Sequence, residues 1–423
     1  MQTVKRYAAA PEGLGADDVR QAVLETLGGL PRVPRKVLLV PPDHTRMHSM
    51  AGPVAEAFRR ELPPGCVIDV LPALGTHVAM TRGEWDEMYP GFDHSRMLVH
   101  HWRDEVIQIG EIPADFVREI SGGLMDSPVP VDVNRHLLDP SYDLILSVGQ
   151  VVPHEVAGMA NHAKNIFVGC GGSGMINASH MLGAVCGMED IMGRDRTPVR
   201  ALFDYAAEHF LGSLPLVYAL SVTTADAGGV HLHGLFIGDE RGAFEEAVRL
   251  SQKKNIFHLD KPIQKAIVML DGDEFKSTWL GNKAIYRTRM AIADGGELII
   301  LAPGVSRFGE DAEADRLIRK YGYSGINNIL KHVAAQEELR RNLSAAAHLI
   351  HGSSDDRFSI TYCVRHLKRE EVEGVGFRYL PYNQAAAEYA GLAPGANTDA
   401  SGTEMYYIQN PALGLWTVKG RIA

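Results

Sequence analysis

Short apolar runs that end in loops of Pro, Gly and Asp constrain the fold of this chain more than any other feature. The clearest runs are Lys36–Val40, Val67–Leu71 and Leu144–Val148. Between them stand segments with helical periodicity, such as Val54–Leu62. Apolar runs of this length that alternate with amphipathic helices are typical of buried parallel strands. The sequence therefore predicts an α/β fold.

The chain length predicts more than one domain. With 423 residues the chain exceeds what one hydrophobic core usually supports, so we expect two α/β domains with an interdomain cleft that holds the active site. The strand-then-loop pattern repeats at Ala266–Leu270 and Glu297–Leu301, after a linker-like stretch at Phe257–Pro262. The predicted domains are an N-terminal one of residues 1–257, completed by the tail 397–423, and a C-terminal one of residues 262–392 that closes the cleft and contacts substrate and cofactor.

Composition limits the cellular compartment and the binding partners that we expect. Hydrophobic content of 45% and charged content of 22% are ordinary for a globular protein. The net charge of -10 disfavours nucleic acid as a partner, because phosphate binding needs clustered Lys and Arg. The four cysteines form no CxxC pair, which favours a reducing compartment, and no run of about 18 apolar residues is present. We expect a cytoplasmic protein with no membrane partner, and the sequence leaves its oligomeric state, a homo-oligomer included, open.

Polar side chains follow each of the three predicted strands. Asp43, Thr45 and Arg46 come after the first, His77 after the second and His154 after the third. Ligands of α/β folds bind at the carboxyl ends of the strands, so one shared site is the economical inference. Arg46 would offer a planar fork to an anion, and imidazoles move protons near neutral pH. The alternatives are a surface loop with one internal Asp–Arg pair and a structural role for His77.

The segment from Pro153 to His180 concentrates the candidate chemistry. It places His154, Lys164 and His180 around a glycine-rich turn at Gly169–Gly174. An imidazole can ligate a metal or move a proton, and a lysine amine can carry a covalent cofactor. The turn lacks the GxGxxG spacing of a dinucleotide site, so it is a weak signal for phosphate binding.

Two further pairs carry competing interpretations. Trp279 and Lys283 place an aromatic ring and an amine four residues apart on one face of a helix that we expect to run through Met290. Core packing is the alternative for Trp279. His231 and His233 share one face of a predicted strand, as in some zinc hydrolases, but no neighbouring residue completes a ligand set.

Taken together, these residues resemble the nickel-pincer-nucleotide 2-hydroxy acid racemases, the lactate racemase or LarA-like family. The resemblance lies in the Asp-x-Thr-Arg loop, the Gly-x-His loop and the spacing of the central segment. His154 precedes Lys164 by ten residues, and Lys164 precedes His180 by sixteen. The match extends from Val37 to about Gly309.

The resemblance implies an isomerase that inverts C2 of a 2-hydroxy acid by reversible hydride transfer, through a 2-keto acid. Lys164 would hold the pincer nucleotide (pyridinium-3-thioamide-5-thiocarboxylate mononucleotide nickel) through a thioamide, and His180 would be the protein ligand of nickel. His77 and His154 would be the acid/base pair. The remaining contacts to the cofactor phosphate side or the substrate carboxylate would come from Asp43, Thr45, Arg46 and Lys283. Cofactor-maturation proteins are implied as partners.

Departures from the family pattern concern the expected substrate wall. Trp279-Leu280 stands where lactate racemases have Tyr-Gln, and Asn161-His162 stands where they have Gly-Gly. We therefore expect a substrate other than lactate, larger or a sugar acid. The alternatives are a zinc-dependent hydrolase that uses His231 and His233, and a non-catalytic binding relative of the family. The sequence decides neither which histidine serves which enantiomer nor whether a given sample carries the cofactor.

Overall fold

The computed structural model describes residues 1–226, 228–399 and 401–422. These residues form two compact units. Unit 1 consists of Met1–Ser179 and Met192–Asn255, and unit 2 consists of His180–Ile191 and Ile256–Ala423. The short segment His180–Ile191, which carries one candidate histidine, thus groups with the second unit although it is flanked in sequence by the first.

Unit 1 is built on a six-stranded sheet in the order β1-β10-β9-β6-β2-β3. The strands are β1 (Val4–Tyr7), β2 (Lys36–Val40), β3 (Val67–Val70), β6 (Leu144–Gln150), β9 (Leu216–Asp226) and β10 (Gly229–Gly238). Neighbours from β3 to β9 pair in parallel, whereas β10 and β1 are antiparallel additions. The three strands predicted from their apolar runs are β2, β3 and β6, and β6 is buried along its whole length. The predicted α/β class is confirmed.

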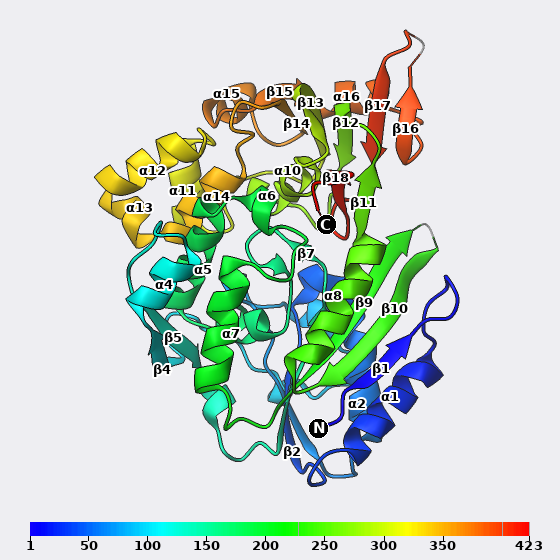
Figure 1. Ribbon diagram of the computed structural model, residues 1–423. Helices are drawn as coiled ribbons and strands as arrows, with labels where there is room; N and C mark the ends of the chain where they lie inside the picture. Colours follow the sequence, from blue (N-terminus) through cyan, green and yellow to red (C-terminus); the bar gives the residue numbers. More distant parts are fainter. Residues whose placement is uncertain (227, 400, 423) are drawn as a thin grey trace. The chain divides into compact units, whose positions relative to one another are not determined.

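Helices cover this sheet. They are α1 (Ala16–Gly28), α2 (Ala51–Glu61), α3 (Arg82–Met88), α4 (Ala114–Ile120), α7 (Pro198–Phe210) and α8 (Arg241–Asn255), with the first part of α5 (Ser173–Val185). Figure 1 shows α8 lying along β9 and β10, and α1 beside α2. Apolar side chains of α2, such as Val54 and Phe58, pack with Val37 and Leu39 of β2 into one buried core. Two hairpins, β4 (Val106–Ile112) with β5 (Val129–Asn134) and β7 (Pro153–His154) with β8 (Gly158–Met159), complete the unit.

Unit 2 has its own six-stranded sheet, in the order β15-β14-β13-β12-β17-β16. Its strands are β12 (Ile263–Met269), β13 (Ile292–Ala302), β14 (Ser359–Val364), β15 (Arg378–Pro381), β16 (Gly395–Thr398) and β17 (Glu404–Ile408), and only β16 pairs antiparallel among these described strands. Its helices are α6 (Met188–Ile191), α9 (Thr278–Gly281), α10 (Lys283–Thr288), α11 (Ala312–Tyr321), α12 (Ile326–Ala335), α13 (Glu337–Arg341), α14 (Leu343–His351), α15 (Arg369–Gly374) and α16 (Tyr382–Glu388).

Three sequence predictions need correction in unit 2. The stretch at Phe257–Pro262 is not a linker, because β11 (Ile256–Leu259) pairs in parallel with β18 (Leu415–Val418). The tail 397–423 does not complete the first sheet, because β17 pairs with β12; residues 400 and 423 of that tail lie outside the described residues. The helix expected through Met290 is divided at Asn282 into α9 and α10. Long-range strand pairing decided the first two points, and it leaves little trace in local sequence.

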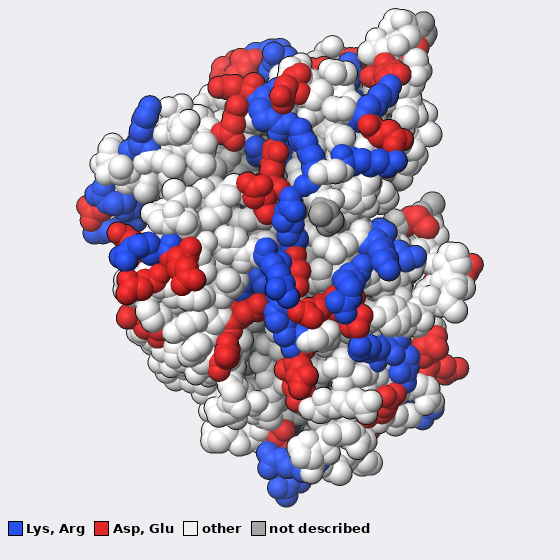
Figure 2. All heavy atoms as spheres, viewed as in Figure 1, with Lys and Arg blue, Asp and Glu red and all other residues white. Residues whose placement is uncertain are grey.

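Charged side chains of both signs are mixed on the surface. Figure 2 shows Lys and Arg interspersed with Asp and Glu on the visible face. Arg241 binds Asp195 and Asp204 in unit 1, at 2.9 and 2.8 Å, as one example of such pairing. None of the described helices has the length and hydropathy that a bilayer span requires.

Candidate active site

Asp43 and His77 form the centre of the candidate site in unit 1. Asp43 follows β2 and caps the 3-10 helix η1 (His44–Ser49), accepting the Thr45 N–H at 2.9 Å. His77 follows β3, the parallel neighbour of β2, and its Nδ1 lies 2.5 Å from Asp43 Oδ2. The carboxyl ends of adjacent parallel strands meet at one edge of the sheet, which explains how residues 34 positions apart come into contact.

Charge stabilises the Asp43 carboxylate. Burial alone would raise the pKa of this carboxyl, but the charge and hydrogen bond of His77, with smaller contributions from Arg46 and Thr45, hold its pKa well below the ordinary value of 3.8. The Thr45 hydroxyl donates to Asp43, and Arg46 Nη1 donates to Thr45 Oγ1 at 3.1 Å. An ionised Asp43 therefore accepts a hydrogen bond from the Nδ1–H of His77, which leaves Nε2 of the neutral His77 ring as the proton acceptor.

His154 has the opposite ring polarity. It lies in the β7–β8 hairpin, and its Nδ1 accepts the N–H of Val156 at 3.1 Å and the N–H of Ala157 at 3.4 Å. Because Nδ1 accepts, the neutral ring carries its proton on Nε2, which lies 3.9 Å from a carboxylate oxygen of Glu155. The two candidate histidines thus differ in which role Nε2 can take.

Lys164 stands at the end of the loop that follows this hairpin. Burial, the dominant cause, lowers the pKa of its amine to about 8, with further lowering by Arg46 and Arg200; the carboxylates of Glu155 and Asp43 act in the opposite direction. Lys164 is followed by a π-helical turn, Asn165–Gly169. The Asn165 side chain ties this turn to the strands by donating to Val40 O at 3.2 Å and Ser147 Oγ at 2.9 Å.

Unit 1 thus brings together most of the predicted cofactor and proton-transfer residues. Asp43, Thr45, Arg46 and His77 are linked by hydrogen bonds, and Lys164 interacts electrostatically with Asp43 and Arg46. Three loops deliver these side chains, after β2, after β3 and after β8. The site predicted at the carboxyl ends of the strands is therefore a real cluster in space, whose assigned roles remain predictions.

Unit 2 holds the predicted residues His180, Trp279, Leu280 and Lys283. His180 lies on the part of α5 that groups with this unit. Lys283 begins α10; it is 8% exposed, and its amine lies 3.6 Å from Glu274 and 5.2 Å from the ring centre of Phe275. The half-buried Trp279 and Leu280 belong to the preceding short helix α9.

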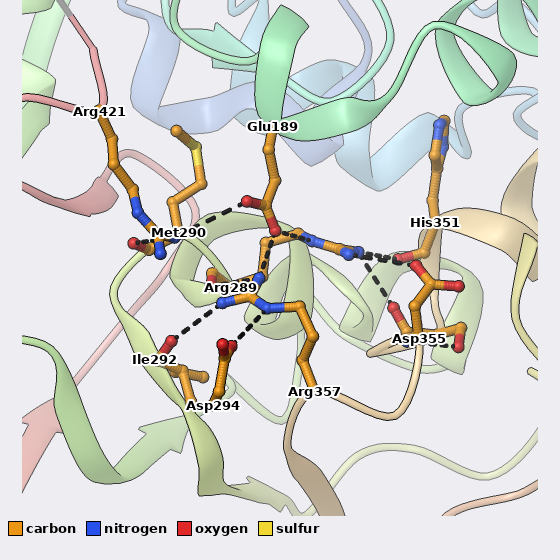
Figure 3. A network of polar contacts seen from close by, with 10 residues as sticks. Glu189, Arg289, Met290, Ile292, Asp294, His351, Asp355, Arg357 and Arg421 are labelled. Atoms are coloured by element: carbon orange, nitrogen blue, oxygen red, sulfur yellow. Dashed lines mark hydrogen bonds and ion pairs between the residues drawn. The ribbon is translucent and has the colours of Figure 1, made fainter.

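The segment that carries His180 is joined to unit 2 by a network of ion pairs. Figure 3 shows Glu189 of α6 facing three arginines. The carboxylate lies 3.1 Å from Arg289, 2.5 Å from Arg357 and 3.7 Å from Arg421. Arg289 also reaches Asp355 at 3.4 Å. A network with one shared carboxylate holds a short helix more firmly than an isolated surface pair does.

Comparisons with known proteins agree with this architecture. Residues 19–191 match the family model of the lactate racemase N-terminal domain. This part of the chain is therefore similar to the N-terminal domain of lactate racemase. That domain includes every candidate of unit 1 named above, together with His180.

Two solved structures share the fold of this chain. A crystal structure of a protein from Thermotoga maritima is 22% identical, with a TM-score of 0.85, and the match covers 97% of this chain and 100% of that one. The lactate racemase apoprotein from Thermoanaerobacterium thermosaccharolyticum is 15% identical, with a TM-score of 0.68, and the match covers 96% of this chain and 93% of that one. No curated protein sequence matches the chain.

Asn161 and His162, the residues expected at the substrate wall, are both buried. Both adopt left-handed backbone, with φ of 71° and 59°. The His162 ring stacks on Phe244 at 5.1 Å and lies tilted against Tyr218 at 4.1 Å between ring centres, and neither of its nitrogens has a hydrogen-bond partner among the described residues. Burial, with the charges of nearby arginines, lowers its pKa well below 6.5. Packing explains the burial of the His162 ring, and its place at the substrate wall stays a prediction.

His231 and His233 of β10 have separate partners. His231 Nε2 lies 3.0 Å from Asp226, and His233 Nε2 lies 2.7 Å from the Thr224 hydroxyl. In the part of the chain that the structure describes, no group of three or more His, Cys, Asp or Glu side chains could hold a metal ion. The geometry gives the zinc-hydrolase alternative no support.

Sequence reasoning missed two buried polar residues. His348 of α14 stacks on Trp279 at 4.2 Å, and its ring nitrogens lie 2.9 Å from the hydroxyls of Tyr286 and Tyr323. Arg200 of α7 is 1% exposed and donates to backbone carbonyls of the loop before Lys164. Each stands in an ordinary amphipathic helix, so only burial distinguishes it from a surface residue.

Proposed function

We propose that this protein is an isomerase that inverts C2 of a 2-hydroxy acid through a 2-keto acid. The observation that carries the proposal is the cluster in unit 1, where Asp43 orients His77 and where the amine of Lys164 lies in the field of Arg46. The match of residues 19–191 to the lactate racemase N-terminal domain supports the reaction class.

The residues present fit a nickel-pincer nucleotide. An amine whose pKa is lowered to about 8 is partly uncharged at neutral pH, which suits covalent attachment through Lys164. Arg46 is suited to the phosphate side of a nucleotide, and the imidazole of His180 is a common nickel ligand. When bound, such a group supplies a hydride acceptor for the Cα hydrogen of the substrate.

The two histidines would provide the proton chemistry. His77 donates a hydrogen bond from Nδ1–H to Asp43, and it therefore presents Nε2 as a base for the substrate hydroxyl. His154, with Nδ1 accepting backbone N–H groups, carries the proton of its neutral ring on Nε2 and so presents a hydrogen-bond donor to the substrate oxygen. Removal of a hydroxyl proton on one face and its return on the other needs one ring in each state. We infer that His77 begins the reaction as base and His154 as acid, for the enantiomer whose hydroxyl faces His77.

Substrate binding would depend on positive charge and on the wall residues. Arg46 in unit 1 and Lys283 in unit 2 are the cations that we assign to the substrate carboxylate. Trp279, stacked on His348, presents a rigid aromatic surface where lactate racemases have a tyrosine. We propose a substrate larger than lactate, such as a sugar acid.

The test is co-expression with cofactor-maturation proteins and nickel. We expect an adduct on Lys164 by intact mass, nickel that is lost in His180→Ala but kept in His231→Ala, and inversion of at least one acid in a panel of 2-hydroxy acids. Loaded protein that inverts no member of the panel would favour the non-catalytic alternative. A best rate with lactate would refute the proposed substrate class.

A further inference from the structure

The start of α7 holds the loop between the two candidate residues His154 and Lys164. Arg200 Nη2 donates to the carbonyl of Met159 at 2.6 Å, and its terminal nitrogens lie 3.4 Å from the carbonyl of Asn161. Thr197, which caps α7, donates to the carbonyl of Ala157 at 3.4 Å. The N-terminal end of α7 thus binds the carbonyls of three alternate loop residues, Ala157, Met159 and Asn161.

Arg200 is an unusual residue for this task. It is 1% exposed, and among the described residues it forms no ion pair, because the nearby Asp195 and Asp204 bind Arg241 instead. Burial lowers its pKa to about 10, so the guanidinium stays charged at neutral pH. A fully buried cation without a paired carboxylate is costly, and its retention points to a role beyond packing.

The loop itself requires support from its surroundings. The left-handed backbone of Asn161 and His162 is strained for residues with a side chain, and the His162 ring nitrogens have no partners. Phe244 contacts both residues: the His162 ring stacks on it, and the Arg200 guanidinium lies 4.3 Å from its ring centre. The turn that leads into Lys164 is therefore set by Arg200 and Phe244 together.

We propose that Arg200 is a positioning residue for Lys164, acting by holding the Met159 and Asn161 carbonyls and by placing a buried positive charge near the lysine amine. The proposal rests on the assignment of Lys164 as the covalent anchor. The charged groups that act on the amine are Arg46, Glu155, Arg200 and Asp43, with burial as the largest influence. Arg200 thus helps to raise the uncharged fraction of the amine and to fix its position, and both favour attachment.

The experiment is competitive acetylation of the full-length apoprotein across pH, with Lys164 quantified by peptide mass spectrometry. For the natural sequence we expect a midpoint near 8. In Arg200→Met the midpoint should rise by about half a pH unit or more, because one nearby charge is lost. Arg241→Met is the matched control: it removes a neighbouring cation that does not touch the loop, and the Lys164 midpoint should move by less than about 0.2.

Arg200→Lys separates charge from the hydrogen-bonding fork. It should keep the midpoint within about 0.3 of the natural value, yet hydrogen exchange of residues 157–164 should be about threefold faster or more, since lysine lacks the planar fork with which arginine holds both carbonyls. If Arg200→Met does not fold, the result for Arg200→Lys alone tests the proposal. An unchanged midpoint in Arg200→Met, or unchanged exchange in Arg200→Lys, overturns the proposal. A missing Lys164 adduct in co-expressed natural protein would instead refute the proposed function and leave these apoprotein results standing.

Discussion

The substitution Asp43→Asn tests the centre of the candidate site. Asp43 accepts hydrogen bonds from the Thr45 N–H, the Thr45 hydroxyl and His77 Nδ1. Asparagine can keep the two bonds to Thr45 through its carbonyl oxygen, but its NH₂ group then faces His77. The imidazole must move its proton to Nε2, so that the proposed base becomes a donor.

The size of the expected effect follows from the interactions that Asp43→Asn removes. One charge-assisted hydrogen bond to a buried carboxylate corresponds to about 1.5–3 kcal/mol of local stability. Loss of the correct tautomer should reduce kcat of cofactor-loaded protein by roughly 10²–10⁴. Local stability is measured by hydrogen exchange of residues 41–50, and the tautomer by nitrogen NMR of labelled histidine.

The pH dependence has a definite sign. The folded-state pKa of Asp43 lies below 3.8, so its contribution to stability is fully present above pH 3.8 and is lost as pH falls through the folded value. The stability gap between the natural protein and Asp43→Asn should therefore be constant near neutral pH and shrink in acid.

The matched control is Glu87→Gln, which removes an exposed carboxylate 2.9 Å from His44. Because the Glu87 side chain is 63% exposed, we expect a change below about 0.5 kcal/mol. If Asp43→Asn changes stability, tautomer and kcat no more than this control does, the assignment of His77 as an oriented base is refuted.

Three further predictions concern separate parts of the chain. Lys164→Arg should abolish the covalent adduct in intact mass spectra of co-expressed protein, because a guanidinium is not nucleophilic; an adduct of unchanged mass would place the anchor elsewhere. Glu189→Gln should speed hydrogen exchange of residues 180–191 by an amount that corresponds to about 1–3 kcal/mol, since Arg289, with a side chain only 7% exposed, loses a charged partner; exchange no faster than in the natural protein would contradict this role. His162→Phe should keep the stacking between Tyr218 and Phe244 and remove two unpartnered nitrogens. Because burial lowers the His162 pKa, the unfolded state binds the extra proton below pH 6.5, so the natural protein should lose up to about 1.4 kcal/mol per pH unit there, a slope that denaturant titrations of His162→Phe should lack.

Local sequence was sufficient for the strands that position the site. The apolar run Lys36–Val40 is β2 without adjustment, and the helical stretch Val54–Leu62 is most of α2 with its C-terminal cap residue. The period of apolar residues is a local property, so it can be read without knowledge of the fold. The polar residues at the ends of β2 and β3 followed from the same pattern, because parallel neighbours expose their carboxyl ends at one edge.

Helix boundaries and long-range strand pairings were harder to predict from the sequence. Asn282 divides the predicted helix because it is buried and accepts the hydroxyl of Tyr362 at 2.7 Å. The pairing of β11 with β18 joins segments more than 150 residues apart, and neither segment carries a signal for its partner.

The sequence alone determined the α/β class, the residue types of the candidate chemistry and their spacing along the chain. Only the tertiary structure decided how they are held: that Asp43 binds His77, that Arg200 supports the loop before Lys164, and that the segment carrying His180 groups with unit 2. The physical reason is that hydrogen-bond partners, burial and the tautomers of the histidine rings depend on which distant segments come into contact. Local sequence patterns do not determine those contacts.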